Sequence, residues 1–314
     1  MAIVGITALV PPEIVYATGN IPIDINNFVP KSGVVPRDKL CAWTALWRDL
    51  TLMGQIKLDK LVVVAGGDCN NALVDGEKIE LSGIDTHYFT YPFDGDPQVM
   101  RHEIDKLLEF LGGEVDESQF KIVTDLKNAA SDIDSERTAM VVKSSDAFEI
   151  MVSGSDLAGS LSGFKDKIDS VKKEGASGDF RLALLGTPPI YEDFHGFLDS
   201  LGLHVVYDEM PYEFLRLGGK SLDEVTRSYA DYTFARNITH RITLLKSELQ
   251  RRSVDGIIHF HQFACHHKLE DPILREALCA EGYPFITIEA DLPSVTPQQT
   301  RLRIEAFKER LGDL

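Results

Sequence analysis

Short apolar runs alternate with longer amphipathic segments along most of the chain. The runs are rich in Val, Ile and Leu and end at glycine, proline or polar residues, which is typical of buried β-strands. We predict strands at Ile3–Leu9, Ile21–Ile25, Leu61–Ala65, His87–Tyr91, Arg181–Leu185, His204–Tyr207, Ile257–Phe263 and Phe285–Glu289.

The amphipathic segments between these runs show the apolar spacing of helices, and several are followed by a glycine that can end a helix. Strands that alternate with helices of this length favour right-handed βαβ units and parallel sheets. The order repeats in the two halves of the chain, so we predict an α/β fold with two Rossmann-like or flavodoxin-like lobes. The predicted helices cover residues 11–18, 38–52, 98–111, 191–201, 237–252, 272–281 and 297–311.

The stretch from about residue 114 to 174 departs from this rhythm. It is polar, helical in pattern and broken by Ser153-Gly154-Ser155. We interpret it as a helical insertion. The predicted organisation is therefore an N-terminal α/β lobe over 1–176, which contains the insertion, and a C-terminal α/β lobe over 177–314.

Composition and charge narrow the classes of partner. Hydrophobic residues make up 44% of the chain, which is enough for a buried core. The formal net charge of −17 argues against nucleic acid or an anionic membrane as a partner. The N-terminus has no basic signal region, and no apolar run approaches the roughly 20 residues of a membrane span. We therefore expect a cytoplasmic protein.

Two cysteines hold equivalent places in the two halves. Cys69 follows the third predicted strand of the first half, and Cys265 follows the third predicted strand of the second. Ligands of open parallel sheets gather beyond the carboxyl ends of the strands. Two thiols delivered to that edge suit a metal or an iron–sulfur cluster in a cysteine-poor chain. The alternative is that the cysteines are unrelated, since Cys is often a small buried hydrophobe.

The other two cysteines differ in their surroundings. Cys41 lies at the start of a predicted helix, where the backbone amides favour a thiolate. Cys279 lies among apolar helix positions that are typical of core packing. Cys41, Cys69 and Cys265 are therefore the candidate ligands, and three thiolates on a cubane would leave one iron open.

Histidines near Cys265 are further candidates. His259 and His261 share one face of a predicted strand, and His266 directly follows Cys265. These histidines suit a zinc site with Cys265, and equally suit substrate contact or proton transfer. Two acidic residues complete the set of candidate acid–base and supporting groups: Glu13 and Asp68.

Several segments, in their order and spacing, resemble one known family. The family is that of 2-hydroxyacyl-CoA dehydratases and benzoyl-CoA reductases, and the similarity is to its iron–sulfur D component. The resemblance covers most of the chain. The segments that carry it are Val10–Ile14, Leu185–Pro188, Leu201–Val206, Asp255–Ile258, Cys265, Pro284–Asp291 and Arg303–Phe307.

The resemblance implies two α/β lobes with a [4Fe–4S] cluster between them, held by three cysteines that correspond to Cys41, Cys69 and Cys265. It also implies a lyase or reductase activity on an acyl-CoA or another small-molecule substrate that binds at the open iron. A separate ATP-hydrolysing activator, itself an iron–sulfur protein, would supply the electron. We expect a homo- or heterodimer.

Two other functions stay open at this stage. The first is an electron-transfer subunit that holds a cluster without substrate chemistry. The second is a zinc-dependent hydrolase that uses Cys265 and the neighbouring histidines. An enclosed pocket beside a cluster favours the enzyme over the carrier, whereas zinc without sulfide favours the hydrolase.

Overall fold

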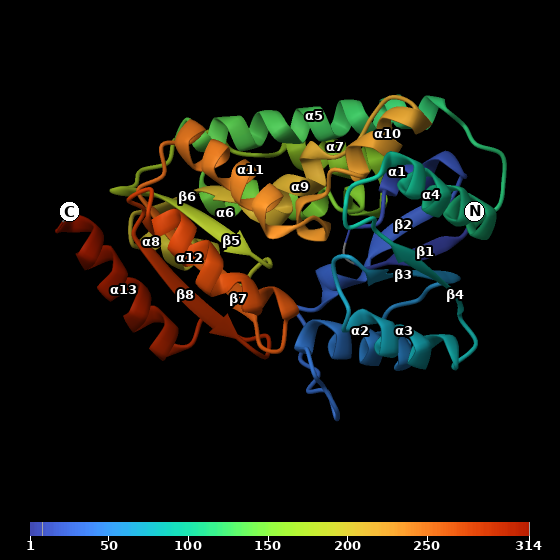
Figure 1. Ribbon diagram of the computed structural model, residues 1–314, viewed down its shortest axis with the longest axis horizontal. Helices are drawn as coiled ribbons and strands as arrows, with labels where there is room; N and C mark the ends of the chain where they lie inside the picture. The colour runs from blue at the N-terminus through green and yellow to red at the C-terminus, as the bar shows by residue number, and fades with distance from the viewer. Residues whose placement is uncertain (8, 314) are drawn as a thin grey trace.

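The computed structural model describes residues 1–7 and 9–313. Ala8, within the predicted first strand, and Leu314, at the end of the predicted second lobe, lie outside the described residues. The strands form two parallel four-stranded sheets, one in each half of the chain (Figure 1). The prediction of an α/β fold with two lobes is confirmed.

The two sheets have the same topology. The first has the strand order β2-β1-β3-β4 and the second β6-β5-β7-β8, so the third strand of each lobe is central. Each predicted strand coincides with an observed one, although the first ends at Ile6, short of the predicted Leu9. The strands are β1 (Ile3–Ile6), β2 (Ile21–Asp24), β3 (Lys60–Gly66), β4 (Asp85–Thr90), β5 (Phe180–Gly186), β6 (Leu203–Asp208), β7 (Gly256–Gln262) and β8 (Phe285–Ala290).

Helices cover both faces of the first sheet. Alternate residues of a strand point to opposite faces, so Leu61 and Val63 of β3 pack with α2 and α3. Val62 and Val64 point the other way and pack with α1 and α4. These helices are α1 (Pro12–Ala17), α2 (Ala42–Leu52), α3 (Ala72–Glu80) and α4 (Pro97–Leu111).

The second sheet is covered in the same way. Leu182 and Leu184 of β5 share a core with α8 and α13, and this core is continuous with that under α2. Ala183 and Leu185 face α11 and α12. These helices are α8 (Phe194–Ser200), α11 (Ile238–Arg251), α12 (Asp271–Cys279) and α13 (Gln298–Gly312).

The segment after β6 returns to the first lobe. It forms two short helices, α9 (Glu209–Arg216) and α10 (Leu222–Tyr229), which the sequence pattern did not predict. Phe214, Val225 and Tyr229 belong to the same buried core as α1 and α4. The chain therefore crosses between the lobes more than once, and the lobe boundary near residue 176 stays a prediction.

The predicted insertion consists of α5 (Ser118–Thr138), α6 (Ser144–Ser153) and α7 (Leu161–Asp169). The long helix α5 runs across the top of both lobes in Figure 1 and contacts α1 in one lobe and β6 in the other. In the described part of the chain, no helix is both long and apolar enough to cross a membrane.

Candidate metal centre

A cavity of about 1090 Å³ lies where the two lobes and the insertion meet. The carboxyl ends of strands from both sheets contribute to its wall: Thr7 follows β1, Asp68 follows β3 and Thr187 follows β5. The insertion adds Phe148 from α6. The cavity is thus at the edge of both sheets where parallel α/β folds bind ligands.

Three of the four cysteines line this one cavity. They are Cys41, Cys69 and Cys265, and all are free thiols. Cys279 does not line it, and the prediction that it packs in the core is wrong, because it lies exposed at the end of α12. The structure therefore brings together the three residues that the sequence selected, from positions far apart along the chain. Their role as ligands stays a prediction.

Each of the three thiols lies at or near the start of a helical segment. Cys41 is the N-cap of α2, and Cys265 is the N-cap of a short 3-10 helix, His266–Glu270. Cys69 comes shortly before Asn71, the N-cap of α3. Unpaired backbone amides at such positions carry partial positive charge and favour a bound anion or thiolate.

Burial has the largest effect on the pKa values of these thiols. It raises the pKa of Cys265 to about 12, and it also raises the pKa of Cys41 and of Cys69. Nearby backbone amides, such as that of His267 beside Cys265, act in the opposite direction. Three neutral thiols in one pocket suit a strongly binding soft metal, because metal binding removes the proton.

The loops that carry Cys69 and Cys265 contact each other directly. Asn71 Nδ2 donates a hydrogen bond to the backbone oxygen of Ala264 at 2.9 Å, which ties one lobe to the other beside the thiols. Ala264 has a φ of 60°, a left-handed conformation that is unfavourable for a residue with a Cβ. The backbone conformation before Cys265 is therefore maintained by tertiary contacts, such as the hydrogen bond from Asn71, and not by the intrinsic preference of alanine.

Gly67 allows the close approach before Cys69. Its φ is 92°, and an added Cβ would lie 2.8 Å from Cβ of Tyr91. Glycine is the residue that tolerates both conditions. The turn that leads to Cys69 therefore depends on Gly67.

Three thiols that line one cavity are a donor type found both in iron–sulfur clusters and in zinc sites. Among residues 1–7 and 9–313, no three His, Cys, Asp or Glu side chains converge as the ligands of one metal ion. Thiolates on one zinc ion lie roughly 4 Å apart, given Zn–S bonds of about 2.3 Å. A cubane presents a different iron to each thiolate, so its ligands stand further apart. Cys41, Cys69 and Cys265 line one cavity, and which of the two arrangements they form stays a prediction.

The predicted histidines divide into two groups. His266 lines the cavity with the thiols, and burial lowers its pKa. His259 and His261 do not line it, because they point to the opposite face of β7 from Phe260 and Gln262. His259 is fully buried and its Nδ1 lies 2.6 Å from Asp271. His261 lines a separate, smaller pocket.

Of the two acidic residues predicted from the sequence, one lines the cavity and the other does not. Asp68 lines the cavity beside Cys69. Glu13 does not: it is fully buried and pairs with Lys127 at 2.6 Å, and Tyr229 donates a hydrogen bond to it at 2.8 Å. This arrangement joins α1, α5 and α10, which is a structural position. A catalytic role for Glu13 stays untested.

Sequence reasoning did not select His267, which lies beside the thiols. Its ring is buried in the cavity wall between Asp68, 3.5 Å from Nε2, and Glu270, 3.1 Å from Nδ1. Burial opposes the charged form, yet the two carboxylates outweigh it and raise the pKa of His267. The one sequence feature that could have indicated His267 is its position two residues after Cys265.

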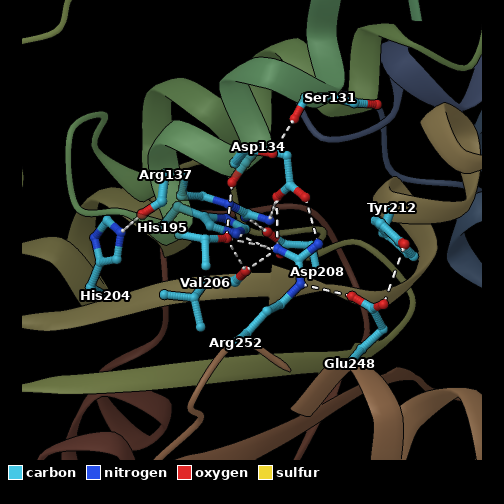
Figure 2. A network of polar contacts seen from close by, with 12 residues as sticks. Ser131, Asp134, Arg137, His195, His204, Val206, Asp208, Tyr212, Glu248 and Arg252 are labelled. Carbon is cyan, nitrogen blue, oxygen red and sulfur yellow. Dashed lines mark hydrogen bonds and ion pairs between the residues drawn. The ribbon is translucent and has the colours of Figure 1, made fainter. Parts of the chain in front are cut away.

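The sequence pattern also did not indicate His195, whose imidazole in the cavity wall is held by a buried carboxylate and a stacked aromatic ring. Its Nε2 lies 2.8 Å from Oδ1 of Asp208, and Arg137 pairs with the other oxygen of Asp208 (Figure 2). Phe148 stacks on the ring at 3.8 Å. Burial raises the pKa of Asp208, but the charges of His195 and Arg137 outweigh this and lower it. The carboxylate therefore fixes the orientation of an imidazole that faces the cavity.

Fold and site together define a class: a two-lobed α/β protein whose strand ends deliver three free thiols to one cavity between the lobes. The chain belongs to the 2-hydroxyglutaryl-CoA dehydratase D-component family, whose model matches residues 7–311. This confirms the resemblance seen in the sequence. No individual curated protein matches the chain.

Proposed function

We propose that the chain is the iron–sulfur component of a cytoplasmic dehydratase, in which Cys41, Cys69 and Cys265 hold a [4Fe–4S] cluster. An ATP-hydrolysing activator supplies one electron, and a small molecule is dehydrated in the cavity. The observation that carries the proposal is that three thiols from both halves of the chain line one cavity. Membership of the dehydratase family supports the reaction class.

The cluster, when bound, supplies one-electron reduction and an iron with an open coordination position. The chain contributes the rest. Cys41 and Cys265 would hold the cluster at the starts of helical segments, where the partial positive charge of the backbone amides would stabilise its negative charge. Cys41 is 5% exposed, and such burial would strengthen these interactions.

Dehydration also requires proton transfer, because a proton leaves the substrate carbon and another must reach the departing hydroxyl. His195 is suited to this task, since Asp208 and Phe148 hold its ring in one orientation. His266 is the second imidazole on the wall that the proposal assigns to substrate contact or proton transfer. His259 and His261 have no place in this scheme because they lie outside the cavity.

The cavity favours an enzyme over a simple electron carrier. A volume of about 1090 Å³ beside the thiols exceeds what a cluster alone occupies and leaves room for a substrate. A carrier requires only electronic contact with its partner. We expect a homo- or heterodimer as the working assembly.

The proposal is tested by reduction and turnover. Anaerobically purified protein is mixed with an activator of this family, and the visible absorption of the cluster is followed with and without ATP. We expect bleaching only with ATP, followed by loss of water from at least one compound in a panel of 2-hydroxy carbonyl compounds. Cys279→Ser is the matched control for Cys41→Ser, which should show neither response. Reduction without any dehydration across the panel would favour the electron-transfer subunit instead.

A further inference from the structure

The charges on the cavity wall are strongly unbalanced. Four lining carboxylates have no Lys, Arg or His within ion-pair distance in the described part of the chain: Asp24, Asp146, Asp156 and Glu192. The lining cations are fewer, and two of them are already engaged. Arg301 pairs with Asp193, and Lys167 lies 4.0 Å from Glu149.

Lys31 is the one remaining lining Lys or Arg among the described residues, and it is exposed. The wall therefore presents a surplus of negative charge to whatever enters. Because the walls of a cleft have a low dielectric constant, they focus the field of such a surplus into the cavity.

Two of the carboxylates lie deep in the wall. Asp24 is 2% exposed and Asp156 is 5% exposed, and the backbone amide of Asp24 donates to Asp156 at 2.8 Å. Burial raises the pKa of Asp24 to about 6. Burial and the charge of Asp24 raise the pKa of Asp156 to about 7. At neutral pH the pair still carries negative charge, and the positive charge of Lys167 offsets it only in part.

A separate observation points to a ligand that donates hydrogen bonds. Gln262 is 1% exposed and lines the cavity at the end of β7. Its Nε2 donates to the backbone oxygen of Asp291, which fixes the orientation of the amide. Its Oε1 then has no donor within the described residues. An unpartnered buried acceptor is costly unless a bound molecule supplies the donor.

We infer that the cavity takes a phosphate-free substrate of neutral or positive charge, which presents hydrogen-bond donors to Asp24, Asp156 and Gln262, and not a CoA thioester. That the bound molecule is a substrate for dehydration rests on the proposed function, whereas the negative charge of the cavity wall does not. The phosphates of CoA would have to approach Asp146 and Glu192 at a wall where, among the described residues, Lys31 is the one lining Lys or Arg that is not already engaged by an acid. An amine or amide would instead gain partners at these positions.

The two tryptophans of the chain make the charge of the cavity measurable. They are Trp43 and Trp47, and both line it. Quenching of their fluorescence by caesium, iodide and neutral acrylamide reports the local potential, with N-acetyltryptophanamide as the reference. We expect the normalised caesium constant to exceed that of iodide by about threefold or more at low salt, as a negative potential requires.

Charge-neutralising variants locate the source of the potential. Asp146→Asn combined with Glu192→Gln should bring the caesium-to-iodide ratio closer to one. The matched control is Glu114→Gln with Glu117→Gln, which removes the same charge from exposed positions outside the cavity and should leave the ratio unchanged. Both pairs lie at the surface or the wall, so folding is not at risk.

The second arm measures CoA directly. Equilibrium dialysis of the anaerobically purified protein with CoA, and separately with butyryl-CoA, should show no saturable binding. Saturable binding of either, or iodide quenching equal to or stronger than that of caesium, would overturn the inference. Absence of iron from the same preparation would instead defeat the proposed function while leaving the charge result intact, so the two failures are distinguishable.

Discussion

Two polar regions of the molecule differ in how their charges are matched. In the network of Figure 2, Asp134 pairs with both Arg137 and Arg252, and Arg252 also pairs with Glu248. On the cavity wall, carboxylates such as Asp146 have no such partner in the described part of the chain. The network ties α5, β6 and α11 together, whereas the wall leaves its charges for a ligand.

The comparison separates groups that serve stability from groups that serve binding. A buried ion pair that loses one partner leaves an uncompensated charge, which costs much more than the pair itself contributes. A surface or wall carboxylate without a partner costs little to remove. His195 is where the two regions meet, because its ring lines the cavity and its Nε2 contacts the network.

The largest expected effect comes from breaking the network. Arg252→Met leaves Asp134 and Glu248 with fewer partners, and we expect the free energy of unfolding to fall by about 3–5 kcal/mol. Urea unfolding measures this. The control is Arg251→Met, which removes a half-exposed partner of the same Glu248 and should cost about 1 kcal/mol or less. Equal losses in the two variants would show that the network is not a special source of stability.

The free energy of unfolding should depend on pH through Asp24, which is buried in the cavity wall. The pKa of Asp24 is about 6 in the folded protein, above its unfolded value of 3.8. Its protonated form is therefore favoured by folding, and this contribution is present below pH 4 and lost as pH rises through 6. Asp24→Asn does not titrate, so its stability relative to the natural protein should improve by up to about 3 kcal/mol between pH 4 and 7.

Urea unfolding at several pH values measures this difference. Asp94→Asn is a control for the exposed surface. A difference between Asp24→Asn and the natural protein that stays flat across this range would mean that Asp24 has a cation partner.

A smaller effect distinguishes two of the imidazoles on the wall, His195 and His266. His195→Ala removes a hydrogen bond to a buried carboxylate, and we expect a loss of about 2–3 kcal/mol. His266→Ala should cost about 1 kcal/mol or less, because its ring is only half-buried on the wall of the cavity. Thermal unfolding of the two variants side by side tests this. The reverse order would place His266, rather than His195, in the supporting network.

The smallest effect is expected for Asp146→Asn. Its carboxylate is half-buried on the wall without an ion-pair partner, so the change in unfolding free energy should stay within about 0.5 kcal/mol. A marked destabilisation would mean that Asp146 belongs with the paired charges and not with the ligand-facing ones. Urea unfolding of Asp146→Asn and the natural protein measures this difference.

The fold and the shared location of the three thiols could be predicted from the sequence because both follow from local signals, whereas the role of the thiols as ligands stays a prediction. Apolar runs mark the strands, and Cys69 and Cys265 each follow the third strand of a lobe. The helices α9 and α10 were missed because their apolar faces pack against the other lobe, and short segments lack a clear period of their own.

The supporting residues of the site depend on contacts that no local pattern records. His195 is set by Asp208 and Arg137, which lie on different elements. Along β7 the sequence does show alternation, but it does not say which face meets the cavity. That face carries Gln262 and not His259 or His261.

Iron and acid-labile sulfide content, measured on anaerobically purified protein, tests the central claim most directly. About four of each per chain are expected for the natural sequence and for Cys279→Ser. Cys41→Ser, Cys69→Ser and Cys265→Ser should each lose most of both while remaining folded by circular dichroism. Full iron and sulfide in all three variants, or zinc without sulfide in the natural protein, would contradict the account.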